Sequence, residues 1–337
     1  MSDHFSCGAA LPQPAVEQPD QGYLDGGGWG IAAAAAWALA GGRGEGMSFA
    51  DVEQGWQPEH ENLPSARIKR PILGDNHFFF GHGTAVLGVV AAAPEAGIGV
   101  HGIAPRVEAI HLSSEWLTPS LHSTARAIER ASRQLGRGDV LLIESETGGF
   151  DLPAEAEPAV FAAIRAATRR GIVVVEAAGN GGREIDGCLL GDSGAILVGA
   201  VAVPSRRRLR GCNFGRRIDC FAWGEGVFTT GDGGSGDDPA VYTNNFSGTS
   251  AAAAIVAGAA LVVQGIARAR RGRPFTPAAL RGILGAEANG TPPAQQDRQR
   301  VGIMPDLAKI IANHRLTAPC PSLYNLPARR SGAARTG

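Results

Sequence analysis

Residues 244–258 read Asn-Asn-Phe-Ser-Gly-Thr-Ser-Ala-Ala-Ala-Ala-Ile-Val-Ala-Gly, and Ser250 lies where a glycine-containing turn gives way to a long apolar stretch. The stretch predicts a buried helix that begins near this serine. A helix N-terminus leaves backbone N–H groups unpaired and carries a partial positive charge, so it can stabilise an anion that forms beside it. The Ser250 hydroxyl therefore suits a nucleophile, although Thr249 or Ser250 could instead simply cap the helix.

Short apolar runs alternate with helical segments along the rest of the chain. Strands are expected at 47–52, 107–112, 140–144, 172–176, 195–203 and 218–222, and helices at 29–39, 85–93, 123–135, 158–170, 251–266, 277–284 and 304–313. Strands that alternate with helices favour a parallel sheet covered on both faces. The sequence therefore predicts an α/β fold with three layers: a doubly wound, mostly parallel sheet with helices on both faces.

The chain is expected to form one folded body with two flanking segments. Residues 1–28 are rich in Pro, Gln and Gly and predict an extended N-terminal arm. Residues 314–337 are rich in Pro, Arg, Ala and Gly and predict a flexible C-terminal tail. Residues 29–313 show neither an internal repeat nor a linker, so they are predicted to form one domain, and the protein is expected to be a monomer.

Composition narrows the classes of partner. The 337 residues carry a formal net charge of −1, which gives no global attraction to nucleic acid or to an anionic membrane. Arginines cluster at 206–208, 268–273 and 329–330 without interleaved aromatic residues, as is typical of solvated loops and helix ends. No secretory signal is visible, and the apolar runs 31–40 and 251–266 are too short to span a bilayer. The sequence alone thus indicates a cytoplasmic protein without a nucleic-acid or membrane partner.

The five cysteines are Cys7, Cys188, Cys212, Cys220 and Cys320. Their odd number and wide spacing fit no zinc ligand set, so no metal site is predicted from them. Two of the three central cysteines are close enough in sequence to pair. Which two would pair, and whether the compartment is oxidising enough, stays open.

Four polar residues stand at strand ends or helix starts, where open α/β sheets place their ligand sites. They are Asp51 at the end of an apolar strand, His82 in Gly-His-Gly before a helix, Asn180 in Ala-Ala-Gly-Asn-Gly after a strand, and Ser250. Taken singly, each residue also has an ordinary structural interpretation. These are a capping aspartate, a structural histidine, an Asn-Gly turn and a helix cap, respectively. Together they supply the carboxylate, base, oxyanion donor and nucleophile of acyl transfer, and the order Asp, His, Ser is a known one.

The chain resembles the subtilisin-like serine peptidases (subtilases) over roughly residues 29–313. The resemblance is carried by residues 49–56 with 60–63, 81–86, 102–105, 174–181 and 247–258. It implies that Ser250 attacks the scissile carbonyl, that His82 takes and returns the proton, and that Asp51 holds the imidazole in the correct tautomer. It also implies an oxyanion hole formed by Asn180 and the Ser250 N–H. The expected activity is that of a serine endopeptidase that works through an acyl-enzyme.

The resemblance further implies a peptide or protein substrate that is bound as an added β-strand along backbone edges. By position these edges lie near residues 143–149 and 176–179. The expected contact residues are Glu144, Ser145, Glu146, Thr147, Gly148, Ala177, Ala178 and Gly179.

The glutamates in these segments depart from the family, which commonly has Ser-Leu-Gly where this chain reads Ile-Glu-Ser-Glu-Thr-Gly-Gly (143–149). One interpretation is that Glu144 or Glu146 makes the specificity pocket acidic and favours Arg or Lys at the cleaved position. The other is that these residues and Glu176 lie on the far side of the strands, paired with arginines. Side chains on a strand alternate between faces, so both stay open.

The resemblance implies no cofactor for the chemistry, although the family often binds structural calcium. Asp232, Asp237 and Asp238 could contribute to such a site, or they could belong to a solvated acidic loop. Ala254 stands where the family usually has proline. About 28 residues precede the first family-like helix, too few for the pro-domain of secreted relatives, so either the chain folds without one or the sequence starts downstream of it.

Two rival functions stay open beside hydrolysis. The same four residues could serve peptide maturation or transpeptidation on a narrow substrate, with an amine in place of water. Alternatively, the fold could bind peptides without cleaving them, an interpretation that the intact set of four disfavours. Relatives are often secreted, so the resemblance leaves the location open.

Overall fold

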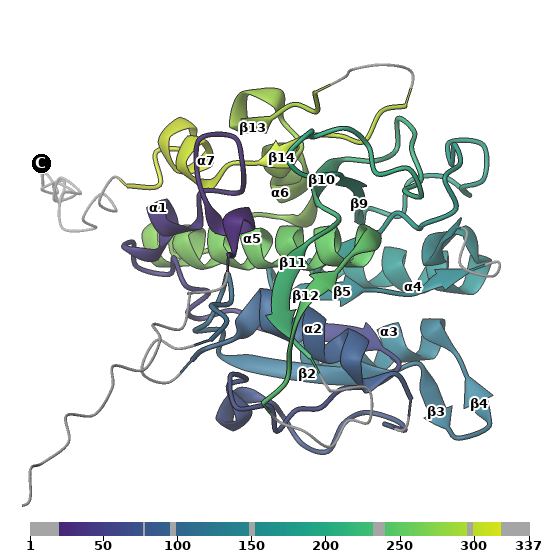
Figure 1. The fold of residues 1–337 in the computed structure, drawn as a ribbon. Helices are drawn as coiled ribbons and strands as arrows, with labels where there is room; N and C mark the ends of the chain where they lie inside the picture. Colours follow the sequence, from purple (N-terminus) through teal and green to yellow (C-terminus); the bar gives the residue numbers. More distant parts are fainter. Residues whose placement is uncertain are drawn as a thin grey trace, which may run out of the picture.

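A six-stranded sheet forms the centre of the protein (Figure 1). The computed structural model describes residues 20–76, 78–94, 99–147, 152–231, 240–294 and 299–317. In spatial order the strands are β10 (Cys220–Trp223), β9 (Ile196–Val201), β8 (Val173–Ala177), β5 (Val140–Ile143), β1 (Ser48–Glu53) and β2 (Ala109–Ser114). All pairings between these neighbouring strands are parallel. Their carboxyl ends therefore meet along one edge of the sheet.

Helices cover both faces of the sheet. They are α1 (Ala33–Trp37), α2 (Phe80–Ala91), α3 (Thr124–Gln134), α4 (Pro158–Arg169), α5 (Gly248–Arg271), α6 (Pro277–Leu284) and α7 (Leu307–Asn313). α2 and α5 pack together on one face, where α5 crosses β5, β8, β9 and β10, while α3 and α4 pack on the other. The predicted three-layer α/β fold is confirmed.

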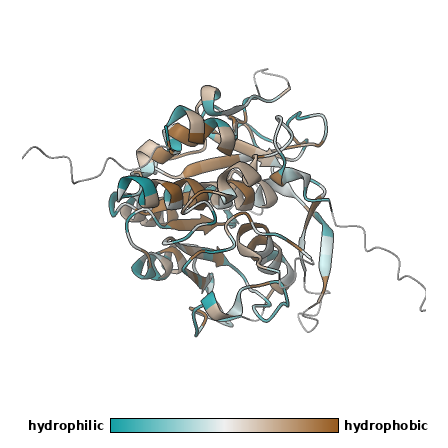
Figure 2. Ribbon diagram, turned by 90° about the vertical axis from the view of Figure 1, so that its left-hand side faces the viewer, coloured by the Kyte–Doolittle hydropathy of each residue, from teal (hydrophilic) through white to brown (hydrophobic). Residues whose placement is uncertain are grey.

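The strands separate two hydrophobic cores because their side chains alternate between faces. Phe49 and Leu142 join the core beneath α2 and α5, whereas Ala50 and Leu141 join the core beneath α3 and α4. Figure 2 shows the hydrophobic colouring concentrated on the strands and on the helices that lie against them. In the described part of the chain, α5 is the helix long and apolar enough to cross a membrane, and that apolar stretch is entirely buried inside this fold.

Four two-stranded ribbons, which the hydrophobic periodicity of the sequence did not indicate, lie outside the central sheet. They are β3 (Trp116–Thr118) with β4 (Leu121–His122), β6 (Glu146–Thr147) with β7 (Leu152–Pro153), β11 (Val227–Thr230) with β12 (Tyr242–Phe246), and β13 (Gly290–Thr291) with β14 (Met304–Pro305). All four are antiparallel. Two to five residues a strand are too few to show a period of two in the sequence.

Some element bounds differ from those expected. The segment 304–313 was expected to be one helix, but it splits into β14 and α7. Asp306 caps α7 by accepting a hydrogen bond from the Lys309 N–H at 3.1 Å, and Pro305 disfavours a helical conformation for the residue before it. The helix expected at 29–39 is shorter, and α2 begins earlier, so that His82 lies within its first turn.

The folded body extends beyond both predicted boundaries. Residues 20–28, assigned from composition to an extended arm, include the short helix η1 (Gly22–Leu24), and Tyr23 is buried with its hydroxyl donating to the Phe228 carbonyl at 3.2 Å. At the other end Leu316 is buried in the main core. The arm and tail boundaries of 28 and 314 are therefore corrected. The rest of both segments lies outside the described residues.

The three central cysteines are free. Cys188 is exposed, and Cys212 and Cys220 are buried, so none of the three pairings left open by the sequence is formed. Cys7, Cys320, Gly148 and the aspartates considered for calcium (Asp232, Asp237 and Asp238) lie outside the described residues.

Candidate active site

Ser250 is the third residue of α5, at the edge of the sheet where the parallel strands end. Gly248 starts this helix with φ +82°, a conformation that favours glycine, and a Cβ there would lie 3.0 Å from Asn180 Oδ1. Ser247 occupies the N-cap position but makes no side-chain capping bond, and the Thr249 hydroxyl accepts from the Gly179 N–H at 3.2 Å. These hydroxyls do not cap α5, which leaves its positive end facing the site.

Asn180 follows β8 and is tied to the start of α5. Its Oδ1 accepts a hydrogen bond from the Thr249 N–H at 3.0 Å. This bond directs the amide nitrogen Nδ2 away from the helix, where it donates to the Glu146 carboxylate. The donor end of Asn180 is thus already occupied by a negatively charged group, the kind of partner that an oxyanion-hole donor would receive.

His82 reaches the same edge from α2, and its Nδ1 contacts the carboxylate of Glu53, the last residue of β1. The imidazole packs edge-on against Phe246, with ring centroids 5.4 Å apart. A close approach of two backbones brings the histidine here, because a Cβ on Gly83 would lie only 2.4 Å from the Gly55 carbonyl oxygen. Only glycine at position 83 allows α2 to sit this close to the loop after β1.

The expectation that Asp51 holds the imidazole is corrected by these contacts. Asp51 is completely buried, and its Oδ2 accepts from the indole N–H of Trp56 at 2.8 Å. The reason is geometric: β1 continues through Glu53, and two strand residues span roughly 6.6 Å, so Asp51 lies too far back along the strand. Glu53 was missed, although its position on the same face and nearer the strand end could have identified it.

Among the hydrogen bonds that join described residues, none connects Ser250 to His82. Catalytic hydrogen bonds are often long in the absence of substrate and tighten when it binds. The structure therefore shows Glu53 and His82 in contact, with Ser250 and Asn180 at the adjoining helix terminus.

Three carboxyl groups, those of Asp51, Glu53 and Glu144, lie on one face of the sheet behind the site and form what we term the acidic cluster. All three residues are at most 7% exposed, and the Ser250 hydroxyl faces the buried carboxyl group of Glu144. Burial raises the pKa of Asp51 and of Glu144, and the nearby charge of Glu53 raises both further. Asp51 and Glu144 therefore keep their protons to higher pH than ordinary carboxyl groups.

The acidic cluster also acts on the base. Burial by itself lowers the pKa of His82, but the charge and hydrogen bond of Glu53, together with the charges of Asp51 and Glu146, outweigh burial and raise it. The imidazolium form is thus stabilised in the free protein. An imidazole of this kind is a stronger base once it is neutral.

The glutamates whose orientation the sequence left open divide between the two faces. Glu176 points to the α4 side, where it accepts from the Glu155 N–H at 2.7 Å, and Glu155 in turn pairs with Arg217 at 3.3 Å. Glu144 lies beneath the site, with its carboxyl oxygens shielded from solvent. Glu146 is partly exposed at Asn180. Of the three, Glu146 is the one placed to meet a substrate.

The remaining residues expected to bind substrate are largely engaged within the protein. Ser145 donates its hydroxyl to Glu115, and Thr147 pairs with Leu152 in the β6–β7 ribbon. Ala178 donates its N–H to Val198 at 2.9 Å and accepts from Asn213 at 2.8 Å. The Gly179 N–H is bonded to Thr249 and its carbonyl to the Asn213 N–H. The backbone of 178–179 can therefore contact a substrate by packing, but it offers no free N–H there.

No group of three or more His, Cys, Asp or Glu side chains arranged to hold a metal ion is found within the described ranges.

The chain is similar to known proteases. The family model described as the Subtilase family matches residues 73–302, a span that contains His82, Asn180 and Ser250 but begins after β1. An intracellular serine protease of Paenibacillus polymyxa is 28% identical over 276 residues, covering 73% of this chain and 74% of that protein. An extracellular protease of Xanthomonas campestris pv. campestris is 29% identical over 231 residues, covering 63% of this chain but only 37% of its own length. Subtilisin Savinase of Lederbergia lenta is 32% identical over 186 residues, 55% of this chain and 63% of the relative.

Solved structures share the fold. A protease from Pseudoalteromonas arctica superposes with a TM-score of 0.65 at 24% identity, covering 88% of this chain and 98% of the other. The prenylagaramide maturation protease PagA gives a TM-score of 0.63 at 21% identity, with 85% and 99% covered. The family model matches more than half of the chain, and this protein therefore belongs to the subtilase family.

Proposed function

We propose that this protein is a serine endopeptidase that hydrolyses peptide bonds through an acyl-enzyme. Ser250 is the nucleophile, His82 the general base and acid, and Glu53 the carboxylate that orients the imidazole. Asn180 Nδ2 and the Ser250 N–H form the oxyanion hole. The observation that carries the proposal is the Glu53–His82 contact at the same sheet edge as the N-terminus of α5.

The steps follow from this arrangement. Nδ1–H of His82 donates to Glu53, which fixes the tautomer and leaves Nε2 free to accept the Ser250 proton. The serine oxygen then attacks the carbonyl carbon, and the oxyanion receives hydrogen bonds at the positive end of α5. His82 returns the proton to the leaving amine, and a water molecule activated in the same way releases the acyl group. Each step uses only these side chains.

Glu146 supports a preference for basic residues at the cleaved position. Its carboxylate is partly exposed beside Asn180, whereas that of Glu144 is shielded from solvent. A guanidinium or ammonium group that pairs with Glu146 would also free the Asn180 amide for the oxyanion. Faster cleavage after Arg or Lys than after Leu is expected, and replacement of Glu146 by Gln should remove the difference. Equal rates for the unmodified protein on Arg and Leu peptides would contradict this preference.

The nucleophile is tested by labelling with a fluorophosphonate probe. The unmodified protein should form an adduct at Ser250, and the matched variant Ser250→Ala should form none. Absence of an adduct from a folded protein would refute the proposed peptidase. Incubation of labelled peptides with and without an added amine distinguishes hydrolysis from transfer, because an amide product would appear only if an amine can replace water.

A further inference from the structure

A cavity lies at the edge of the sheet opposite the candidate active site. It has a volume of about 720 Å³. Gly171, Gly194 and Asp219 of its lining stand one or two residues before β8, β9 and β10, so the cavity opens at the amino ends of these strands. Ser250 and Asn180 stand at the carboxyl ends. The two sites therefore use different edges of the same sheet.

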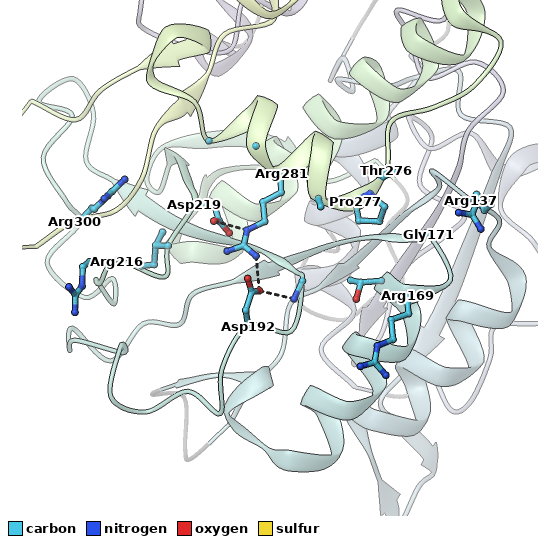
Figure 3. A pocket seen from close by; sticks show the side chains of 16 residues that line it. Arg137, Arg169, Gly171, Asp192, Arg216, Asp219, Thr276, Pro277, Arg281 and Arg300 are labelled. Carbon is cyan, nitrogen blue, oxygen red and sulfur yellow. Dashed lines mark hydrogen bonds and ion pairs between the residues drawn. The ribbon is translucent and has the colours of Figure 1, made fainter.

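The cavity is strongly basic. Its lining carries five arginines against two aspartates, in a chain whose net charge is −1. Figure 3 shows Arg216 and Arg300 on one side, Arg137 and Arg169 on the other, and Arg281 between them. These residues come from the loop before β5, the end of α4, the loop before β10, α6 and the segment before β14. Chain segments far apart in the sequence thus place like charges around one cavity.

The two aspartates do not neutralise the other four lining arginines because they pair with Arg281 of the lining and with Arg217. Arg281 donates from Nε to Asp219 at 2.8 Å and from Nη1 to Asp192 at 2.6 Å. Arg217, beneath the cavity, pairs with Asp219 at 2.9 Å. Two carboxylates are therefore matched by two guanidinium groups.

The remaining guanidinium groups are available. Within the described residues, those of Arg137, Arg169 and Arg300 have neither a hydrogen-bond nor an ion-pair partner, and Arg216 makes only a surface pair with Asp186 at 3.3 Å. The cavity also lies against the first turn of α6, whose N-terminus adds partial positive charge. Three guanidinium groups that line the cavity thus lack a counter-charge, which an anion bound in the cavity would supply.

We propose that this cavity binds a small polyanion with two or more closely spaced phosphate or carboxylate groups. Guanidinium groups match such oxyanions through paired N–H donors. The volume falls in the range of small-molecule sites, roughly 300–1,000 Å³. The described lining contains no aromatic side chain on which a nucleobase could stack, so the anionic groups carry the recognition. The site is independent of the proposed peptidase chemistry.

The test is titration calorimetry of the full chain with tripolyphosphate, and separately with citrate, at fixed ionic strength near 0.15 M. The protein carries Ser250→Ala, so that self-cleavage does not interfere and failure of the peptidase proposal would leave the binding result unaffected. Saturable binding of one equivalent is expected. Tighter binding of tripolyphosphate would identify phosphates, and tighter binding of citrate would identify carboxylates.

Variants locate the site. Arg169→Gln and Arg300→Gln should each weaken binding by about tenfold, the loss of one charge-assisted contact. Arg126→Gln is the matched control, since Arg126 lies near the start of α3, at the far end from Arg137, and it should change binding less than about twofold. A Cβ on Gly282 would meet no atom within 4 Å, so Gly282→Glu can place a carboxylate in the cavity and should weaken binding, whereas Gly282→Gln should not.

Three results would overturn the proposal. The first is no saturable binding of either anion. The second is equal weakening by the Arg126, Arg169 and Arg300 variants, which would indicate a diffuse charge effect. The third is equal effects of Glu and Gln at position 282. An acidic peptide that binds while both small anions fail would also reject the proposed class and assign the surface to a protein partner. Circular dichroism of each variant shows that lost binding does not reflect unfolding.

Discussion

The role of Glu53 can be separated from that of Asp51 by two substitutions that remove charge but preserve shape. Glu53→Gln keeps a group of the same size against His82 but replaces a carboxylate acceptor with an amide. Asp51→Asn keeps an oxygen that can accept from Trp56 and does not touch the imidazole. The burial of Asp51 and the charge of Glu53 raise the pKa of Asp51, so a neutral amide imitates the protonated form that this environment favours.

The expected losses differ greatly. Replacing the orienting carboxylate of a Ser-His-acid triad by its amide costs about 10⁴-fold in kcat, or about 5.4 kcal/mol. The side chain of His82 is 39% exposed, so water compensates in part, and a loss of about 10³- to 10⁴-fold is expected for Glu53→Gln. Asp51→Asn leaves the contact between Glu53 and His82 intact and should cost less than about tenfold.

The pH profile provides a second, independent readout. His82 acts as a base only when neutral, so kcat/KM rises with pH through the pKa of the free protein, which lies above the ordinary value of about 6.5. Glu53→Gln removes the main cause that raises this pKa and should shift the rising limb to lower pH. Asp51→Asn should shift the limb in the same direction but by less.

The assay is hydrolysis of a fluorogenic peptide across pH 5–10, with fluorophosphonate titration to count active sites in the unmodified protein and circular dichroism to establish folding. If Asp51→Asn abolished activity while Glu53→Gln kept more than a tenth of it, Asp51 would be the orienting carboxylate. The contact seen in the structure would then not be the catalytic one.

Three further predictions concern neighbouring parts of the site. Asn180→Ala should lower kcat by about 10²- to 10³-fold with little change in KM, measured by steady-state kinetics, and a change confined to KM would place Asn180 outside the oxyanion hole. Gly83→Ala should push α2 away from Gly55, because the Gly55 carbonyl oxygen would lie 2.4 Å from the new Cβ. The substitution should lower kcat by roughly 100-fold, and fluorescence of the buried Trp56 should report the displacement. Unchanged kinetics would show that the close approach of Gly83 to Gly55 is not needed. Glu144→Met, tested by thermal unfolding in a Ser250→Ala background, should stabilise the protein by about 1–3 kcal/mol at pH 9 and by less at pH 5. The reason is that burial raises the pKa of Glu144, so the stability of the protein with Glu144 is lost as pH rises through that pKa. A stability difference that did not vary with pH would contradict this.

The sequence predicted the start of α5 well because local signals coincide there. Gly248 needs a positive φ, the residues after Ser250 are small and apolar, and the helix they form is buried along its length, so turn chemistry and composition agree. Asn180 is similarly local, since it follows a strand whose apolar run is unmistakable. The local sequence around each of these two residues was therefore enough to predict the element on which it lies.

The carboxylate could not be placed in the same way because β1 carries two acidic residues on one face. Asp51 and Glu53 are two residues apart on the strand, so both side chains point to the same face. Which of them meets His82 depends on the position of α2, and that position is set by the close approach of Gly55 and Gly83. These glycines lie 28 positions apart. The expectation that the acidic residue type would be aspartate favoured Asp51, whereas the structure favours the residue that the strand carries furthest toward His82.

Net charge concealed a second feature of the molecule, the separation of charge between the two edges of the sheet. In a parallel α/β fold, loops before and after each strand alternate along the sequence but lie on opposite edges in space. Glu53, Glu144 and Glu146 end strands or follow them, whereas Arg137, Arg169 and Arg216 precede them. Summed over the chain these charges nearly cancel, and a window along the sequence mixes both kinds. Only the fold sorts them, so a chain with a net charge of −1 presents an acidic edge around a base and a basic cavity at the other edge. The composition argues only against extended polyanions that need a charged face, and that argument does not extend to a small anion that needs only a few arginines around one cavity.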